Sequence, residues 1–514
     1  MTLAPDVLDR LGPLGSLATD IARELGERRA IRRLHDLDHT LWREDPTELA
    51  DRLGWIPVVA EVRADLGDLR RRCARLVDGV DHVLVMGMGG SSLFPEVLAQ
   101  TLAGAGGPEL HVLDTTDPAA IARIAAGLPP ERTLHLASSK SGSTIETRSH
   151  LEWAWARSGD PARFAVVTDP GSDLGALARE RGFAEVFENR PDIGGRYSAL
   201  SLFGIVPALL AGVDAEALLD GGLDALDACG PDVPPEANPA IALAAALAAG
   251  VRAGRDKATL APHPRASALG LWWEQLVAES LGKDGTGVVP IVGEPLGPPD
   301  VYGDDRLFLV DPDHSTPAAS LRAAGHPVIE LRAGPDPRAL GWFVVVTELA
   351  TALTGAAIGV QPFDQPDVAA AKAATNEVLA QGGASVDETP LADARAQLEP
   401  GDHLAIQAFV DPGSPAAAAL QAARVALRDQ HRVATSLGFG PRFLHSTGQL
   451  HKGGPRAIVC VQVVAPISAE IPIPGRDFGF GHLEHAQAAG DLRTLLARGI
   501  RAARVPLSEL AGEA

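Results

Sequence analysis

Ten residues, Ser138 to Thr147, combine six hydroxyl side chains with one lysine, one glycine and one glutamate in the stretch SSKSGSTIET. The stretch follows an apolar run, TLHLA. Such residues suit a phosphate group, because glycine lets the backbone approach, hydroxyls donate hydrogen bonds and lysine adds positive charge. A plain polar linker has a similar composition, so the interpretation depends on where the stretch lies in the fold.

A second turn of small residues follows another apolar run, in MGMGGSSLFPE, Met86 to Glu96. It lacks the third glycine of a dinucleotide-binding turn and the GK[ST] of a Walker loop, so a tight structural turn is an alternative. Both turns are predicted at the carboxyl ends of parallel strands, where each leads into a helix. Because helix N-termini carry unpaired amides and partial positive charge, the two turns together favour an anion site.

Candidates for acid–base chemistry lie farther along the chain. Arg196 stands beside a glycine turn in GGRYSALSLFG, with a helix predicted from about Tyr197. Gln275 and Glu279, in WWEQLVAESLGKDGTG, are four residues apart and share one helix face. A loop arginine or a helical glutamate is often simply solvated. An arginine aimed into a cleft would instead stabilise developing negative charge.

Two further segments carry pairs of polar side chains whose spacing could bring them to the same side of a helix. Gln365 and Lys372, in QPFDQPDVAAAK, are seven residues apart and lie on similar helix faces, although a lone lysine is usually solvated. The segment HLEHA, with His482 and His485, does not match the HExxH pattern of a zinc helix, so no metal is predicted.

The elements that must position these residues alternate between strand and helix from about residue 80. Short apolar runs that read as strands alternate with helical patterns, and this alternation predicts an α/β fold with a parallel sheet and helices on both faces. The strands are predicted at 81–87, 109–114, 133–139, 163–169 and 184–188. The helices are predicted at 92–104, 118–128, 144–159, 172–182 and 197–212.

Three other parts of the chain are predicted around this sheet. Residues 1–55 read as amphipathic helix, and GPDVPPEANP reads as a joint between domains. A second α/β part follows, with strands at 258–261, 287–292, 306–311 and 327–332 and helices near 239–254, 266–282 and 336–358. The last part has strands at 403–410 and 457–465 and one helix predicted at 415–438.

Composition limits the classes of function. Hydrophobic residues make up 46% of the 514 residues, which is enough for a large core. The net charge of −21 disfavours nucleic acid, whose backbone demands clustered Lys and Arg. The three cysteines are far apart and fit a reducing cytoplasm, and no signal peptide is expected. The apolar run at 340–360 carries Glu348 at its middle, which favours a buried core helix over a membrane span.

Taken in order, five segments resemble the glucose-6-phosphate isomerase family of the double sugar-isomerase-domain type. They are GMGGSSLFP, SSKSGSTIET, GGRYSALSLFG, ESLGKDG and PFDQPDVAAAK. The resemblance covers roughly residues 80 to 380. It implies two flavodoxin-like sugar-isomerase domains and a cytoplasmic enzyme that interconverts glucose 6-phosphate and fructose 6-phosphate, without metal or redox cofactor.

The resemblance also implies roles for individual residues. The residues that it places at the substrate phosphate are Ser91, Ser139, Ser141 and Thr144, with Lys140 and Ser143 adjacent and Gln365 on the phosphate side; Gly90 is also expected to bind substrate. Glu146 matches the family's loop glutamate, and Gln275 lines the site. Glu279 matches the base that moves a proton between C1 and C2, and Arg196 the group that stabilises the intermediate. Lys372 matches the lysine of ring opening and charge stabilisation.

One departure from the family pattern concerns a histidine that normally follows the catalytic glutamate by a few tens of residues. The corresponding region here, PDVYGDDRLFLVD, has no histidine. The C-terminal stretch FLHSTGQLHKGGP looks like the missing segment displaced in chain order, and it is similar to the isomerase half of fused transaldolase–glucose-6-phosphate isomerases. The hypothesis is that His445 or His451 reaches the site; a structural loop histidine is the alternative.

The predicted domains are a helical segment at 1–55, sugar-isomerase domains at 56–230 and 231–385, and a C-terminal α/β extension at 386–514. The resemblance implies a homodimer with the site near the subunit interface. Two alternatives stay open: a dual phosphoglucose/phosphomannose isomerase, and a non-catalytic sugar-phosphate-sensing regulator. The acid/base pair Glu279 and Lys372 and the negative net charge argue against the regulator, since such proteins usually add a DNA-binding module.

Overall fold

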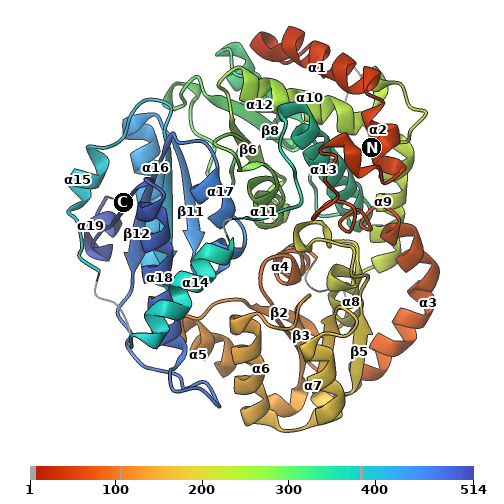
Figure 1. The fold of residues 1–514 in the computed structure, drawn as a ribbon, viewed down its shortest axis with the longest axis vertical. Coiled ribbons are helices and arrows are strands. Elements are labelled where there is room, and N and C mark those ends of the chain that lie inside the picture. The colour runs from red at the N-terminus through yellow and green to blue at the C-terminus, as the bar shows by residue number, and fades with distance from the viewer. Residues whose placement is uncertain (1–6, 103, 105, 367, 383–385, 514) are drawn as a thin grey trace.

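Three parallel β-sheets, each covered by helices, form three lobes around a common centre (Figure 1). The structure is a computed structural model that describes residues 7–102, 104, 106–366, 368–382 and 386–513. The predicted α/β class is therefore confirmed. The domain boundary predicted at 385 lies outside the described residues, and the other domain boundaries stay predictions.

The first sheet has the strand order β2-β1-β3-β4-β5, and every strand pair is parallel. Its strands are β1 His82–Met86, β2 Glu109–Leu113, β3 Thr133–Ser138, β4 Phe164–Thr168 and β5 Glu185–Glu188. Its helices are α4 Leu93–Thr101, α5 Pro118–Ala126, α6 Ile145–Ser158, α7 Asp173–Arg181 and α8 Leu202–Leu210. All five strands match the sequence prediction, because buried parallel strands read as continuous apolar runs.

The second sheet has the order β7-β6-β8-β9 and is also parallel. Its strands are β6 Lys257–Ala261, β7 Val289–Ile291, β8 Arg306–Val310 and β9 Val328–Glu330. The helices of this region are α9 Ala215–Ala228, α10 Pro239–Arg252, α11 Leu269–Leu281, α12 Ser315–Ala323 and α13 Pro337–Ile358. Helices α9, α10, α11 and α13 continue the apolar core of the first lobe, so the two lobes share one hydrophobic cluster, whereas α12 packs in a separate one.

Helix α13 is long and apolar enough to cross a membrane, but it is a core helix of this fold. It packs between α9 and α10, and 89% of its most apolar window is buried. Glu348, at its middle, is 2% exposed, and burial raises the pKa of this carboxyl. The predicted preference for a buried core helix is confirmed.

The third sheet belongs to the C-terminal extension and has the order β11-β10-β12-β13, again parallel. Its strands are β10 His403–Phe409, β11 Ala434–Phe439, β12 Ile458–Val464 and β13 Arg501–Arg504. Its helices are α15 Leu391–Arg395, α16 Pro415–His431, α17 Gly448–Gly453, α18 Phe480–Ala497 and α19 Leu507–Ala511. Helix α14, Val368–Ala380, lies on α18, so the segment that carries Lys372 packs against this extension (Figure 1).

Three local predictions were wrong. The helix predicted at 415–438 ends at His431, where Arg432 adopts a left-handed φ of 56°, and the chain continues as β11. The helix predicted from Tyr197 begins only at Leu202, after a 3₁₀ turn over Gly195–Tyr197. The N-terminal segment is not one helix, because α1 Gly15–Glu27 and α2 Ala30–His35 are separated by a left-handed residue; α3 Val58–Leu76 follows later.

Candidate active site

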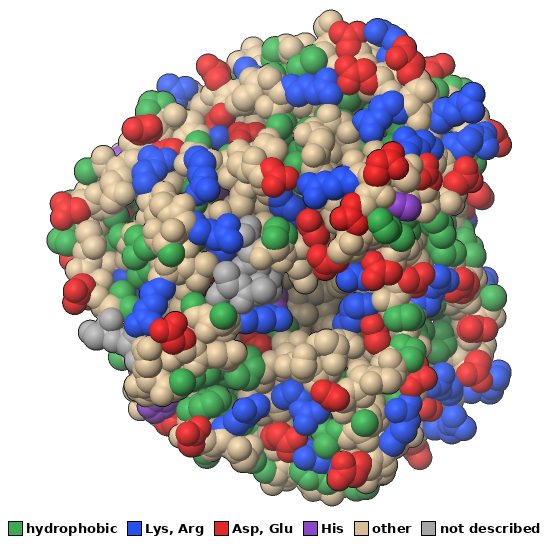
Figure 2. All heavy atoms as spheres, in the orientation of Figure 1, with side chains coloured by type: hydrophobic (Ala, Val, Ile, Leu, Met, Phe, Trp, Pro, Cys, Tyr) green, Lys and Arg blue, Asp and Glu red, His purple; other side chains and the backbone are tan. Residues whose placement is uncertain are grey.

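A cavity of about 570 Å³ opens where the three lobes meet. Figure 2 shows this hollow near the middle of one face, with Lys and Arg side chains on its rim. Most of its walls come from loops at the carboxyl ends of the first sheet. The remainder comes from α11, from the C-terminal extension, and from Glu48, Arg52, Phe363, Gln365 and Lys372. The predicted site residues that line it are Gly90, Ser91, Ser139, Lys140, Ser141, Thr144, Arg196, Gln275, Glu279, Gln365, Lys372 and His445.

The turn before α4 and the turn that carries Arg196 touch one another at this cavity. A Cβ atom on Gly90 would lie 1.9 Å from the carbonyl oxygen of Gly195, which leaves no room for a side chain. Gly89 has a φ of +56°, and a Cβ there would lie 2.8 Å from Nε2 of Gln275. The glycines are therefore required for the close approach of the turn before α4 to the turn that carries Arg196.

The hydroxyl-rich loop between β3 and α6 surrounds the N-terminus of α6. The hydroxyls of Ser139 and Thr144 lie 3.4 Å apart, and the Gly142 amide donates to Ser139 Oγ at 3.2 Å. Gly142 needs its φ of +72°, because the loop folds back against Leu174. Unpaired amides at a helix N-terminus together with hydroxyls suit an anion. Ser143 lies outside the cavity lining and contacts Ser141 Oγ at 2.9 Å.

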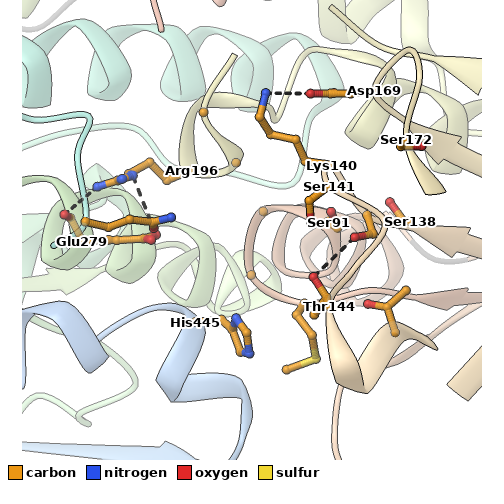
Figure 3. A pocket seen from close by; sticks show the side chains of 18 of the residues that line it. Ser91, Ser138, Lys140, Ser141, Thr144, Asp169, Ser172, Arg196, Glu279 and His445 are labelled. Carbon is orange, nitrogen blue, oxygen red and sulfur yellow. Dashed lines mark hydrogen bonds and ion pairs between the residues drawn. The ribbon is translucent and has the colours of Figure 1, made fainter. Parts of the chain in front are cut away.

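Lys140 is held at the cavity wall rather than aimed freely into it. Its ammonium lies 2.7 Å from Asp169 Oδ2 and donates to the Pro191 carbonyl at 2.5 Å (Figure 3). Burial raises the pKa of the Asp169 carboxyl, and the hydrogen bond from Lys140 opposes that rise. In this structure Lys140 thus ties the hydroxyl loop to the loop after β4.

Glu279 is a buried cavity residue and not a surface glutamate: it is 7% exposed. Its Oε2 lies 3.7 Å from Nε of Arg196 and accepts a hydrogen bond from Gln275 Nε2 at 3.1 Å. Arg196 also donates to the Glu279 carbonyl at 2.5 Å and to the Phe363 carbonyl at 2.8 Å. Figure 3 shows Glu279 and Arg196 on one side of the cavity, across from the hydroxyl groups of the other wall.

A buried lysine that the sequence prediction did not single out supports the segment with Gln365. Lys283 Nζ donates to Asp364 Oδ1 at 2.6 Å and to the Gln361 carbonyl at 2.7 Å. Burial, reinforced by nearby Arg196, lowers the pKa of Lys283 to about 7. Lys283 thereby fixes the turn that leads to Gln365 and Lys372 at the cavity.

His445 enters the cavity from the C-terminal extension. In Figure 3 it lies below both the wall that carries Glu279 and the wall that carries the hydroxyl groups. Its Nε2 lies 3.0 Å from Oε1 of Glu146, and its carbonyl accepts from Gln275 Nε2 at 2.9 Å. Gln487, on α18, donates to the same Glu146 oxygen at 2.6 Å. Burial opposes ionisation of Glu146, but the charge and hydrogen bond of His445 outweigh it and lower the pKa of this carboxyl.

The other candidate histidine, His451, is not brought to the cavity. It is 3% exposed, and its Nδ1 lies 3.0 Å from Gln407 Nε2 inside the third lobe. Burial lowers its pKa to about 3, which keeps the ring neutral. Of the two histidines that the sequence left open, the structure therefore places only His445 where it could act.

Besides Lys283, sequence reasoning missed three groups at the site, one of which is the pair Glu48 and Arg52 in the cavity wall. Gln487 belongs to a helix more than 300 residues away from its partner Glu146, and no local pattern marks it. The loop from Asp169 to Ser172 also lines the cavity. Its position directly after β4 could have identified it, since ligands of parallel sheets bind at the carboxyl ends of strands.

The fold and the site define an α/β protein with a polar cavity in which a buried carboxylate and guanidinium face a hydroxyl-rich helix N-terminus. Comparison with known proteins is more specific. The phosphoglucose isomerase family model matches residues 56–292. A glucose-6-phosphate isomerase of Rubrobacter xylanophilus is 30% identical over 370 residues, which cover 60% of this chain and 84% of that protein. The chain therefore belongs to the phosphoglucose isomerase family.

Solved structures agree with this assignment at the level of the fold. A hypothetical protein from Thermus thermophilus superposes with a TM-score of 0.60 at 27% identity, covering 73% of this chain and 97% of that one. A glucose-6-phosphate isomerase from Chlamydia trachomatis gives a TM-score of 0.58 at 18% identity, covering 71% of this chain and 86% of that one. The fold is thus the α/β sugar-isomerase fold.

Proposed function

We propose that this protein interconverts glucose 6-phosphate and fructose 6-phosphate through an enediolate. The observation that carries the proposal is the placement of Glu279: a buried carboxylate, 3.7 Å from Arg196, that faces a hydroxyl-rich helix N-terminus across one cavity. Membership of the phosphoglucose isomerase family supports the same activity.

Glu279 acts as the base that shuttles one proton. It takes the proton from C2 of the open-chain aldose, the C2 electrons form the C1–C2 double bond, and the C1 oxygen becomes negatively charged. Arg196 stabilises that charge. The proton of the C2 hydroxyl then moves to the C1 oxygen, Glu279 returns its proton to C1, and the C2 oxygen becomes the carbonyl of the ketose. Gln275 orients the carboxylate through its 3.1 Å hydrogen bond. This chemistry requires no metal or redox cofactor.

The hydroxyl loop binds the substrate phosphate. Ser91, Ser139, Ser141 and Thr144 present donors beside the α6 N-terminus, where the helix dipole favours an anion. Binding the phosphate at this end of the cavity positions C1 and C2 near Glu279, which is how remote binding energy contributes to the rate of a reaction.

Ring opening is assigned to His445, with Lys372 at the same cavity as the second group. A proton must move between the ring oxygen and the anomeric hydroxyl before isomerisation starts. The 3.0 Å contact with Glu146 orients the His445 imidazole for that transfer.

The deciding experiment compares Glu279→Gln with Glu274→Gln, a glutamate of the same helix that lies outside the cavity lining. Glu279→Gln is expected to reduce turnover of glucose 6-phosphate by roughly 10²–10⁴-fold, the usual contribution of a general base. Glu274→Gln should retain turnover. Equal turnover in both variants would exclude Glu279 as the base, and a native chain that does not turn over glucose 6-phosphate would be a binder rather than an isomerase. Mannose 6-phosphate, assayed in parallel, tests the dual-specificity alternative.

Cytoplasmic location and a homodimer, which the family resemblance implies, complete the proposal. Analytical ultracentrifugation of the full chain tests the dimer. Fractionation of cells that express the chain tests the location.

A further inference from the structure

A compact cluster of metal-ligating side chains lies far from the cavity, on the first sheet. His82 Nδ1 and His111 Nε2 are 3.2 Å apart. Oε2 of Glu109 lies 3.6 Å from the first of these nitrogens and 3.5 Å from the second. Three potential ligand atoms of two residue types thus form a nearly equilateral triangle, and none of these residues takes part in the proposed reaction.

The backbone holds this triangle in place. His82 begins β1 opposite Glu109 of β2, and Leu84 pairs with His111 in the same parallel register. Side chains two residues apart on a strand point to the same face, so all three project from one side of two adjacent strands. β2 is the edge of the sheet and pairs only with β1 among the described strands.

The separations are those of a tetrahedral metal site. Zinc binds histidine nitrogen and carboxylate oxygen at about 2.0–2.2 Å, and two ligands of a tetrahedron at such distances are about 3.3–3.6 Å apart. The three observed separations, 3.2, 3.5 and 3.6 Å, lie close to this range on all sides of the triangle. We infer that His82, Glu109 and His111 form a binding site for a divalent transition metal ion of the zinc type, with its fourth position open to solvent.

A hydrogen bond between two neutral imidazoles would explain the 3.2 Å separation alone. It would not explain why one carboxylate oxygen is almost equidistant from both ring nitrogens. His82 and His111 have side chains 21% and 26% exposed, so an ion in solution can reach them.

The position of the site indicates a structural role. His82 starts β1, whereas the cavity residue Met88 follows the end of that strand, roughly 20 Å away along the chain at ~3.3 Å per residue. A bound ion would connect the edge strand β2 to β1 and stabilise the folded state, since a ligand that binds only the folded state raises the free energy of unfolding. Turnover should not respond to it.

The test uses the full-length protein after treatment with a chelator. Zinc is titrated against a chromophoric competitor, and cobalt is added separately, because tetrahedral cobalt reports its geometry in the visible spectrum. The variants are His82→Ala, His111→Ala and Glu109→Gln. His482→Ala is the matched control, since it removes an exposed imidazole that lies 2.6 Å from a carboxylate of Glu470, outside this cluster.

The expected result is one zinc ion per chain, a tetrahedral cobalt spectrum and a zinc-dependent rise in thermal unfolding temperature, all retained in His482→Ala. Each histidine variant should weaken zinc at least ~10- to 100-fold, the loss that even supporting groups of metal ligands typically cause. Circular dichroism verifies that the variants are folded, independently of any isomerase activity. Unchanged zinc affinity in both histidine variants, or no stoichiometric binding by the native chain, would overturn the inference.

Discussion

Nε2 of His445 lies 3.0 Å from Oε1 of Glu146, although the two residues are 299 positions apart and belong to different lobes. The contact places an imidazole from the C-terminal extension at a cavity otherwise built mainly by the first two lobes. An oriented imidazole beside a carboxylate is suited to proton transfer near neutral pH.

Replacing His445 should affect cyclic substrates most. His445→Ala is expected to lower turnover of glucose 6-phosphate by ~10²–10⁴-fold, because a positioned acid/base group contributes about that much. A four-carbon aldose 4-phosphate cannot close a ring through its phosphorylated oxygen, so its isomerisation should fall far less. Steady-state kinetics on both substrates measure the ratio. Equal losses on the two substrates would contradict a role in ring opening.

His451→Gln should lower the unfolding temperature while leaving turnover near the native level.

Gln487 is expected to act on turnover through Glu146, because its amide donates to that carboxylate at 2.6 Å. Gln487→Leu should reduce kcat and leave KM nearly unchanged, since Gln487 does not line the cavity. In Gln487→Glu the new carboxyl can donate only while protonated, and its ionised form repels Glu146. The kcat of this variant should therefore decline as pH rises, over a range where the native enzyme is flat. Gln421→Glu, on α16, is the control, and a pH profile parallel to the native one would refute the idea.

The proposed binding of phosphate by the hydroxyl-rich loop predicts that changes in this loop raise KM. Ser141→Ala and Thr144→Val should each raise KM for sugar phosphates by roughly 10- to 100-fold, because a hydrogen bond to a charged group contributes ~1.5–3 kcal/mol. Ser158→Ala, at the opposite end of α6, should change nothing. Initial-rate kinetics with glucose 6-phosphate measure KM in each variant. A loop that does not bind phosphate would leave KM unaffected in both variants.

Gly90→Ala should impair the site by pushing two turns apart. The added Cβ would lie 1.9 Å from the Gly195 carbonyl, next to Arg196, so the backbone must shift. We expect a loss of turnover together with a destabilisation of roughly 1–3 kcal/mol, typical of overpacking. Gly127→Ala is the control, since its φ is −92° and the nearest atom lies 3.8 Å away. A Gly90→Ala variant with native turnover and KM would show that activity does not require the close approach of the Gly90 and Gly195 turns.

The raised pKa of the buried Glu274 carboxyl predicts that the free energy of unfolding depends on pH. Burial raises its pKa to about 7 in the folded protein, against an ordinary value of 4.5. The folded state therefore holds a proton that the unfolded state releases between these values, and stability falls as pH rises from 4.5 through 7. The difference corresponds to roughly 3 kcal/mol. Glu274→Gln mimics the protonated form and should be more stable than the native protein at about pH 8, with little difference at about pH 4. Urea unfolding at both pH values measures this, and a variant less stable at the higher pH would contradict it.

Much of the fold could be predicted because its signals are local. The central strands of the first sheet are mainly apolar runs, and small polar residues follow β1 and β3. Strand β11 was missed because the helical composition before it continues into ATSLG, and only the left-handed turn at Arg432 ends the helix. Strand β13, with the sequence RAAR, carries no apolar pattern at all.

By itself, the sequence determined the alternation of strands and helices, the two small-residue turns and the order of segments that marks the family. Only the tertiary structure decided which polar side chains share one cavity. Glu279 is buried because three lobes close around it, Lys140 is paired with Asp169, and His445 rather than His451 reaches the site. These outcomes depend on contacts between residues far apart in the chain, whereas propensity and periodicity report only on neighbours within a few turns.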